Sequence, residues 1–157
     1  MKVVPVLGKR QKNKNNFKSK TLPQSKDAGF LLGFNLEFRF MSEFRWGFIG
    51  NGWIAKVLAE DFKVAGLKIQ AIGARSQAKA DEFANTYGIP NRHDSYEKLV
   101  NDSEVDIVYV ATPHPFHVRD AILALNAGKH VLCEKPFTIN EKEAIQIKEA
   151  ATRNNRF

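Results

Sequence analysis

The 157-residue chain is 43% hydrophobic and 26% charged, with one cysteine and a formal net charge of +7. A single cysteine excludes an internal disulfide framework and an all-cysteine zinc site, and fits a reducing compartment, so we expect a cytoplasmic protein. Residues 1–40 hold nine Lys and Arg against two Asp and Glu, whereas residues 41–157 hold fifteen of each. The excess charge therefore lies in the first forty residues and does not mark the remainder as a nucleic-acid binder.

Residues 1–42 form a basic leader without clear periodicity, and the stretch from Gly8 to Lys26 is rich in Lys and Asn. Such a composition buries too little apolar surface to offset its ordering entropy, so we expect a disordered extension. It could instead be a targeting peptide or a tail that binds nucleic acid or acidic surfaces. We favour sequence translated ahead of a natural start at Met41. The apolar run from Gly29 to Phe40 is shorter than the roughly 20 residues that span a bilayer, so no membrane contact is expected.

From Phe44 onward, short apolar strands alternate with segments of helical periodicity. The elements predicted in chain order are a strand over 44–49, a helix from 54 to a stop at 66, a strand over 67–74, a helix over 77–87, a helix opening at 94–95, a strand over 105–110, a helix over 116–127, a strand over 130–133 and a helix from 140 to about 151. Parallel strands need crossover connections of this kind. The pattern predicts an α/β fold over residues 43–157, with a doubly wound parallel sheet of the Rossmann type.

Helix ends and faces are also predicted from the sequence. Asp94 with Glu97, and Asn140 with Glu143, have the spacing of capping boxes at the starts of two helices. The side chains expected to point inward from the helix over 77–87 are those of Ala78, Phe83 and Ala84.

The first strand-to-helix turn carries Gly50-x-Gly52-x-x-Ala55, the dinucleotide-binding fingerprint with alanine in the third position. Gly50 permits the tight turn, Gly52 lets the backbone approach a pyrophosphate, and Ala55 lets the helix pack closely on the sheet. The helix N-terminus then offers free N–H groups and a partial positive charge to the phosphates. A turn of purely structural purpose is the alternative. The residues expected to contact the dinucleotide here are Gly50, Asn51, Gly52, Trp53 and Ile54.

The end of the second predicted strand bears on the choice between NADP and NAD. NAD sites place an acid about twenty residues past the fingerprint, on the ribose 2′-OH, but no Asp or Glu lies between Phe62 and Ala80. Arg75 can pair with a 2′-phosphate and stack on the adenine, and Ser76 can donate to the same phosphate. NADP is therefore favoured, with NAD as the alternative. Alternatively, Arg75 could be solvated and Ser76 could cap the next helix, in which case neither residue would indicate a cofactor preference.

The second half of the chain carries Thr112-Pro113-His114-Pro115-Phe116-His117, then Gly128-Lys129-His130-Val131 and Glu134-Lys135-Pro136. Together with the glycine turn, these motifs resemble the Gfo/Idh/MocA family of nicotinamide-dependent oxidoreductases, named for glucose–fructose oxidoreductase and inositol dehydrogenase. The resemblance covers about residues 44–151, the N-terminal Rossmann domain of that family. Family members continue into a C-terminal α/β domain that supplies the substrate pocket and usually the oligomer interface. We expect that domain to be absent from this sequence, and a homo-oligomer only for a full-length form.

The resemblance implies hydride transfer at a hydroxyl or carbonyl of a small sugar, polyol or dihydrodiol. Lys135 would lie beside the nicotinamide, hydrogen-bond the substrate oxygen and stabilise a developing alkoxide. Glu134 would contact the nicotinamide ribose, and Pro136 would shape the turn, often with a cis bond. His114 departs from the usual Asn of the family, which puts that side-chain contact in doubt. The residues implied to line the nicotinamide side are Ala111, Thr112, Pro113 and His117.

Other interpretations remain at this stage. The chain could be a non-catalytic nucleotide-binding module or an inactive truncated fragment, and Lys135 could form a surface salt bridge with Glu134. His114 and His117 lack a third metal-ligand type nearby, so no metal site is expected. Cys133, on a strand predicted to be buried, is expected to be an inert core thiol.

Overall fold

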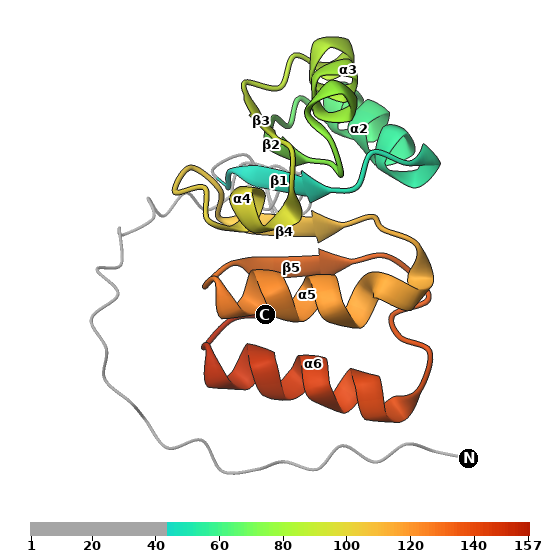
Figure 1. The fold of residues 1–157 in the computed structure, drawn as a ribbon, viewed down its shortest axis with the longest axis vertical. Helices are drawn as coiled ribbons and strands as arrows, with labels where there is room; N and C mark the ends of the chain where they lie inside the picture. The colour runs from blue at the N-terminus through green and yellow to red at the C-terminus, as the bar shows by residue number, and fades with distance from the viewer. Residues whose placement is uncertain (1–43) are drawn as a thin grey trace, which may run out of the picture.

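A computed structural model of the protein describes residues 44–157, and the predicted leader lies outside the described residues. Five strands form one sheet in the order β3-β2-β1-β4-β5, and every neighbouring pair is parallel. In Figure 1 the arrowheads of β1, β4 and β5 point to the same side of the molecule. The strands are β1 (Trp46–Ile49), β2 (Ile69–Gly73), β3 (Asn91–His93), β4 (Ile107–Val110) and β5 (His130–Cys133).

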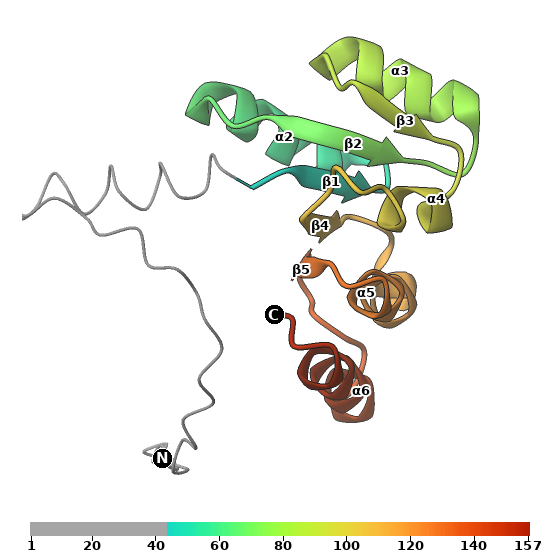
Figure 2. The same ribbon diagram turned by 90° about the vertical axis from the view of Figure 1, so that its left-hand side faces the viewer.

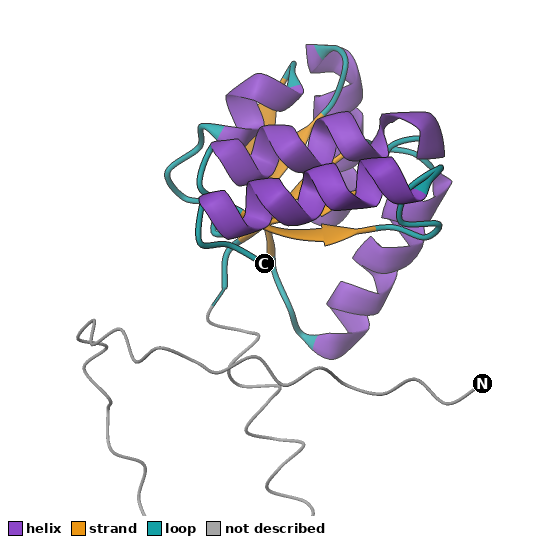
Figure 3. Ribbon diagram, turned by 90° about the horizontal axis from the view of Figure 1, so that it is seen from below, coloured by secondary structure: helices purple, strands orange, loops and turns teal. Residues whose placement is uncertain are grey.

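The crossover helices lie on both faces of the sheet, which confirms the doubly wound α/β fold. Figure 2 shows α2 and α3 on one face and α4 and α5 on the other, and Figure 3 shows α6 lying beside α5. The helices are α2 (Trp53–Ala65), α3 (Gln77–Tyr87), α4 (Tyr96–Val100), α5 (His117–Asn126) and α6 (Glu141–Arg153), with a short 3-10 turn, η1 (His114–Phe116), before α5. The chain winds outward from β1 to β3 and then returns to β4, so the direction of winding reverses between β1 and β4.

Apolar residues on both faces of the central strands build two cores, as expected for a parallel sheet covered on both sides. Under α2 and α3, the Phe48 ring packs edge-on against Phe62 at 5.4 Å and against Tyr109 at 4.9 Å between ring centroids. Under α4 and α5, Ile49 and Val108 pack in the second core. The strands are therefore held from both sides, and their carboxyl ends form a rigid platform.

Local details of the structure differ from the sequence predictions. The strand β3 was not predicted, because Asn91-Arg92-His93 is polar and forms a strand only by pairing with β2. Ser95, not Asp94, caps α4: its hydroxyl accepts from the Lys98 N–H at 3.2 Å, while the Asp94 carboxylate pairs with the Lys98 ammonium.

Ala78 is exposed rather than inward, and Ala80 takes the buried place on α3 together with the correctly predicted Phe83 and Ala84. The Asn140 cap is confirmed, since its side chain accepts from the Glu143 N–H at 3.0 Å. None of the described helices is long and apolar enough to cross a membrane.

A pH-sensitive ion pair joins the starts of β1 and β4. The Arg45 guanidinium donates to both carboxylate oxygens of Asp106, at 2.9 and 2.7 Å, and the Arg45 N–H donates as well. The hydrogen bond from the Arg45 side chain holds the pKa of Asp106 below its ordinary value. Because that pKa is lowered by folding, the pair stabilises the fold above the pKa of the unfolded aspartate, and this stabilisation is lost as the pH falls through the folded value.

Asp106→Asn is therefore expected to lower the unfolding midpoint at pH 7, and the difference from the wild-type protein should shrink as the pH falls below about 4. Denaturant unfolding followed by circular dichroism at several pH values measures this. A difference that stays constant down to pH 3 would contradict the assignment.

Candidate functional site

The strand register brings the predicted site residues to one edge of the sheet. Ile49 is level with Gly73 of β2 and with Val110 of β4, and Val110 is level with Cys133 of β5. The segments just beyond these residues therefore leave the sheet at the same height. They hold the predicted site residues 50–54, 75–76, 111–113 and 134–135, on the side to which the arrowheads point in Figure 1. Ligands of open α/β sheets bind at this carboxyl edge, where the winding reverses.

The two glycines of the first turn stand in different surroundings. Gly50 has φ +96°, and a Cβ there would lie 2.9 Å from the backbone oxygen of Ala111. Gly52 has φ −73°, and a Cβ there would meet no atom within 4 Å. Gly50 is thus required by the protein's own turn, whereas Gly52 borders open space that a ligand can fill.

The start of α2 faces that space. No side chain caps the helix at Gly52, so the first N–H groups of α2 have no side-chain acceptor at that end. Asn51 is half-buried and Ile54 partly buried, while Trp53 is 77% exposed. The helix N-terminus is uncapped and the space beside Gly52 is open, so a pyrophosphate group fits there.

Arg75 and Ser76 follow β2 at the same edge, and both are exposed. The Ser76 hydroxyl makes no capping hydrogen bond to α3 although the residue stands at the cap position. Among the ion pairs of residues 44–157, none involves Arg75. Both side chains are therefore free to contact a ligand beyond β2.

Buried polar atoms without partners gather in the segment after β4. Thr112 is 6% exposed, and its hydroxyl has no hydrogen-bond partner within the described structure; the same holds for the Nε2 atom of His114. Such atoms cost free energy unless a ligand or water satisfies them. The Ala111 N–H donates a hydrogen bond to the Ile49 oxygen at 2.9 Å, which fixes the start of the segment. Pro113 is exposed. The segment thus offers unsatisfied polar groups at the place where the dinucleotide is expected.

Glu134 is held in place by two hydrogen bonds. Its Oε1 accepts from the Tyr109 hydroxyl at 2.7 Å, and its Oε2 accepts from the Lys135 backbone N–H at 2.9 Å. Burial, and then the bond to Glu134, raise the pKa of Tyr109, so this hydroxyl stays a donor. Tyr109 was not predicted as a site residue. The signal for it is its place on β4, level with Leu132, which lies two residues before Glu134.

Lys135 is exposed at the same edge, and the bond to its neighbour Pro136 is cis, as the family resemblance implied. The surface salt bridge considered for Lys135 and Glu134 is not among the ion pairs of residues 44–157. The carboxylate of Glu134 is instead turned toward Tyr109 and the backbone. The ammonium of Lys135 is therefore available to a ligand oxygen.

His117, the first residue of α5, is only 2% exposed. Its Nε2 lies 2.8 Å from the Thr112 oxygen and its Nδ1 lies 3.0 Å from the Pro136 oxygen. The structure thus places His117 at the expected edge, but beneath the surface and with both ring nitrogens against backbone oxygens.

Cys133 is half-buried rather than buried, because β5 lies at the edge of the described sheet. Burial still raises its pKa to about 11, which keeps the thiol protonated and unreactive at neutral pH. Within residues 44–157, no three His, Cys, Asp or Glu side chains converge as metal ligands would.

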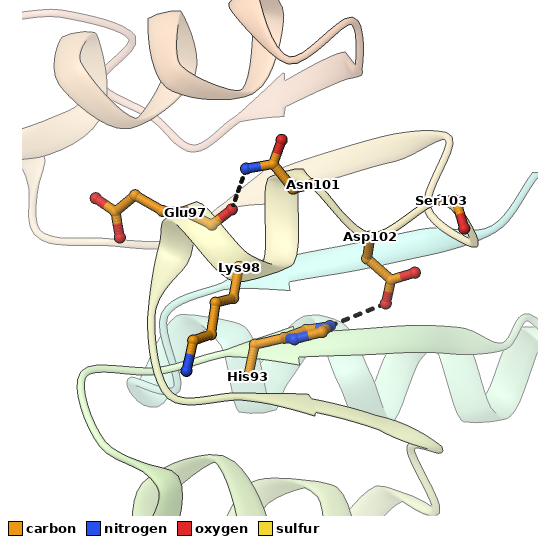
Figure 4. A pocket seen from close by; sticks show the side chains of 6 residues that line it. All are labelled: His93, Glu97, Lys98, Asn101, Asp102 and Ser103. Carbon is orange, nitrogen blue, oxygen red and sulfur yellow. Dashed lines mark hydrogen bonds and ion pairs between the residues drawn. The ribbon is translucent and has the colours of Figure 1, made fainter.

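A polar hollow lies along α4, on the β3 side of the sheet (Figure 4). There the His93 Nε2 meets the Asp102 Oδ2 at 2.9 Å, and the same carboxylate oxygen accepts from Asn91 at 2.8 Å. The Lys129 ammonium donates to the backbone oxygens of Asp102 and Val105, both at 2.7 Å. These bonds join β3 to the segments that precede β4 and β5, which indicates a structural role for the cluster.

Comparison with known proteins identifies the domain. The Gfo/Idh/MocA oxidoreductase family, described as having an NAD-binding Rossmann fold, matches residues 44–157. A trans-1,2-dihydrobenzene-1,2-diol dehydrogenase of Danio rerio is 43% identical over 120 residues, which cover 72% of this chain and 35% of that protein. The chain thus spans about a third of the length of this curated relative.

Solved structures agree with the fold. A 3-ketoreductase from Actinomadura kijaniata in complex with NADP superposes with a TM-score of 0.68 at 30% identity, covering 73% of this chain and 37% of that one. A biliverdin reductase from Synechocystis sp. PCC 6803, in complex with biliverdin and NADP+, gives 0.63 at 31% identity, covering 72% and 36%. The protein belongs to the Gfo/Idh/MocA oxidoreductase family, and residues 44–157 are its NAD(P)-binding Rossmann domain.

Proposed function

We propose that the protein binds NADP in preference to NAD and serves hydride transfer at a carbon that carries a hydroxyl group. The observation that carries this proposal is the convergence of the uncapped α2 N-terminus, the free Arg75 and the unpaired Lys135 on one sheet edge. When bound, the nicotinamide supplies the acceptor or donor of the hydride. The protein's own residues supply binding, orientation and charge.

The chemical role that we propose for Lys135 follows from its charge and place. Oxidation of an alcohol removes a hydride from carbon and releases the hydroxyl proton to water, so negative charge builds on the oxygen as the proton leaves. The Lys135 ammonium can donate a hydrogen bond to the oxygen and stabilise this charge. Glu134, fixed by Tyr109, would accept from the hydroxyls of the nicotinamide ribose.

The proposed substrate class is a small sugar, polyol or dihydrodiol. Support comes from the relatives, since several matched proteins are trans-1,2-dihydrobenzene-1,2-diol dehydrogenases, with identities of 36–44%. The matched segments cover about a third or less of those proteins, for example 35% of the Danio rerio protein and 24% of the Oryctolagus cuniculus protein. The activity of the whole protein is therefore part of the proposal.

The NADP preference rests on Arg75. No carboxylate lies between Phe62 and Ala80 to accept the ribose 2′-OH, and the Arg75 guanidinium can form charge-assisted hydrogen bonds with a 2′-phosphate. Arg75→Ala is therefore expected to weaken NADPH binding about 10- to 100-fold, as expected for hydrogen bonds to a charged group. NADH affinity should fall much less, because NADH lacks the phosphate and would lose only the stacking of Arg75 on the adenine.

Calorimetric titration of both nucleotides measures the two affinities. Arg153→Ala, at the exposed end of α6, is the matched control, since it removes the same charge far from the sheet edge. An equal loss for NADPH and NADH in Arg75→Ala would refute the 2′-phosphate contact. Binding of neither nucleotide by the folded wild-type chain would overturn the cofactor proposal itself.

A further inference from the structure

The segments that follow β4 and β5 leave the sheet together but run out of backbone hydrogen bonds. The last backbone hydrogen bond between the two strands is donated by the Glu134 N–H to the Val110 oxygen, at 3.1 Å. The next N–H, of Lys135, is taken by the Glu134 side chain, and Pro113 and Pro136 have none to give. Beyond this point, within residues 44–157, no backbone hydrogen bond links the two segments.

His117 is placed to make that link. It is almost fully buried, and its two ring nitrogens reach the Thr112 oxygen in the segment after β4 and the Pro136 oxygen in the segment after β5. Pro136 directly follows Lys135, so the second contact fixes the backbone next to the proposed catalytic ammonium. Since the side chain lies beneath the surface, its effect on a ligand has to pass through these two segments.

We infer that His117 is a positioning residue, whose imidazole ties the segment after β4 to the segment after β5 and so sets the place of the nicotinamide half of the cofactor. This inference rests on the proposed cofactor site. The adenosine half would be bound by the glycine turn and Arg75. It would contact other segments and would not depend on the two His117 contacts.

The test compares NADP+ with 2′-phospho-ADP, which keeps the adenosine half and the pyrophosphate but lacks the nicotinamide and its ribose. His117→Leu is expected to lower NADP+ affinity about tenfold, the worth of roughly one lost hydrogen bond, and to leave 2′-phospho-ADP affinity unchanged. His130→Leu, on β5 at the opposite end of the strand, is the matched control and should change neither. A role confined to folding would shift the unfolding midpoint without changing the ratio of the two affinities.

A second variant keeps the inference testable if His117→Leu folds poorly. His117→Gln keeps one N–H donor, so it can still bond one of the two backbone oxygens. It is expected to lose less NADP+ affinity than His117→Leu and to leave 2′-phospho-ADP affinity unchanged.

Equal losses for both ligands in His117→Leu would overturn the positioning role. Failure of the wild-type chain to bind either ligand would count against the proposed cofactor site instead, so the two failures are distinguishable.

Discussion

Gly52→Ala is expected to lower NADPH affinity more than tenfold while leaving the fold intact, whereas Gly50→Ala should damage both. A Cβ at Gly52 meets no protein atom within 4 Å, and its backbone angles suit alanine. Stability should therefore stay within about 0.5 kcal/mol, because the lost freedom of the unfolded chain offsets the poorer helix cap. The added methyl group would stand where the pyrophosphate has to approach the backbone.

Gly50 differs in both respects. Its φ of +96° strains any L-residue, and a Cβ would press against the Ala111 backbone oxygen at 2.9 Å. Gly50→Ala is expected to lower the free energy of unfolding by about 2 kcal/mol or more, with cofactor binding lost as well. Urea unfolding and NADPH titration of both variants measure the contrast. Two variants with equal stability, or a Gly52→Ala chain that binds normally, would contradict the roles assigned to the two glycines.

Lys135→Met is expected to reduce turnover of a trans-dihydrodiol or polyol about 10²- to 10³-fold, the range seen when a transition-state hydrogen-bond donor is removed. Methionine keeps most of the side chain's length and apolar stem but removes the charge. NADPH affinity should change little, because the ammonium is assigned to the substrate oxygen. Turnover is measured with substrate in excess so that kcat is observed.

Lys148→Met, on the exposed part of α6, serves as the matched control for loss of a lysine charge. If Lys135→Met left kcat unchanged and weakened only cofactor binding, the lysine would be a cofactor ligand rather than a catalytic residue.

The fold could be predicted from sequence because its signals are local. Glycines that end helices, apolar runs such as 107–110 and the Asn140 cap each reflect the physics of a few neighbouring residues. The short strand β3 escaped prediction because Asn91, Arg92 and His93 form a strand only through pairing with β2. Similarly, Ser95 and Asp94 are both good caps in sequence, and the ion pair of Asp94 with Lys98 distinguishes them only in three dimensions.

The site shows the same division. The glycine turn and the motifs around Thr112 and Lys135 indicated which segments would meet at the sheet edge. The hydrogen-bond partners of these motifs could not be predicted from sequence spacing. The Tyr109 hydroxyl donates to Glu134, 25 residues away, and the His117 ring contacts a carbonyl 19 residues away. Such contacts depend on strand register and on where loops leave the sheet, which a single sequence does not encode locally.

Residues 44–157 are expected to form a folded domain whose sheet edge binds NADP. The most direct measurement is a fluorescence titration of the chain with NADPH and, separately, NADH. Trp53 is 77% exposed within the phosphate turn and should report binding, whereas Trp46 is buried in β1 at 4% exposure; Trp53→Phe identifies the signal. We expect saturable quenching with NADPH at lower concentrations than with NADH. A chain that is folded by circular dichroism but binds neither nucleotide would contradict the account.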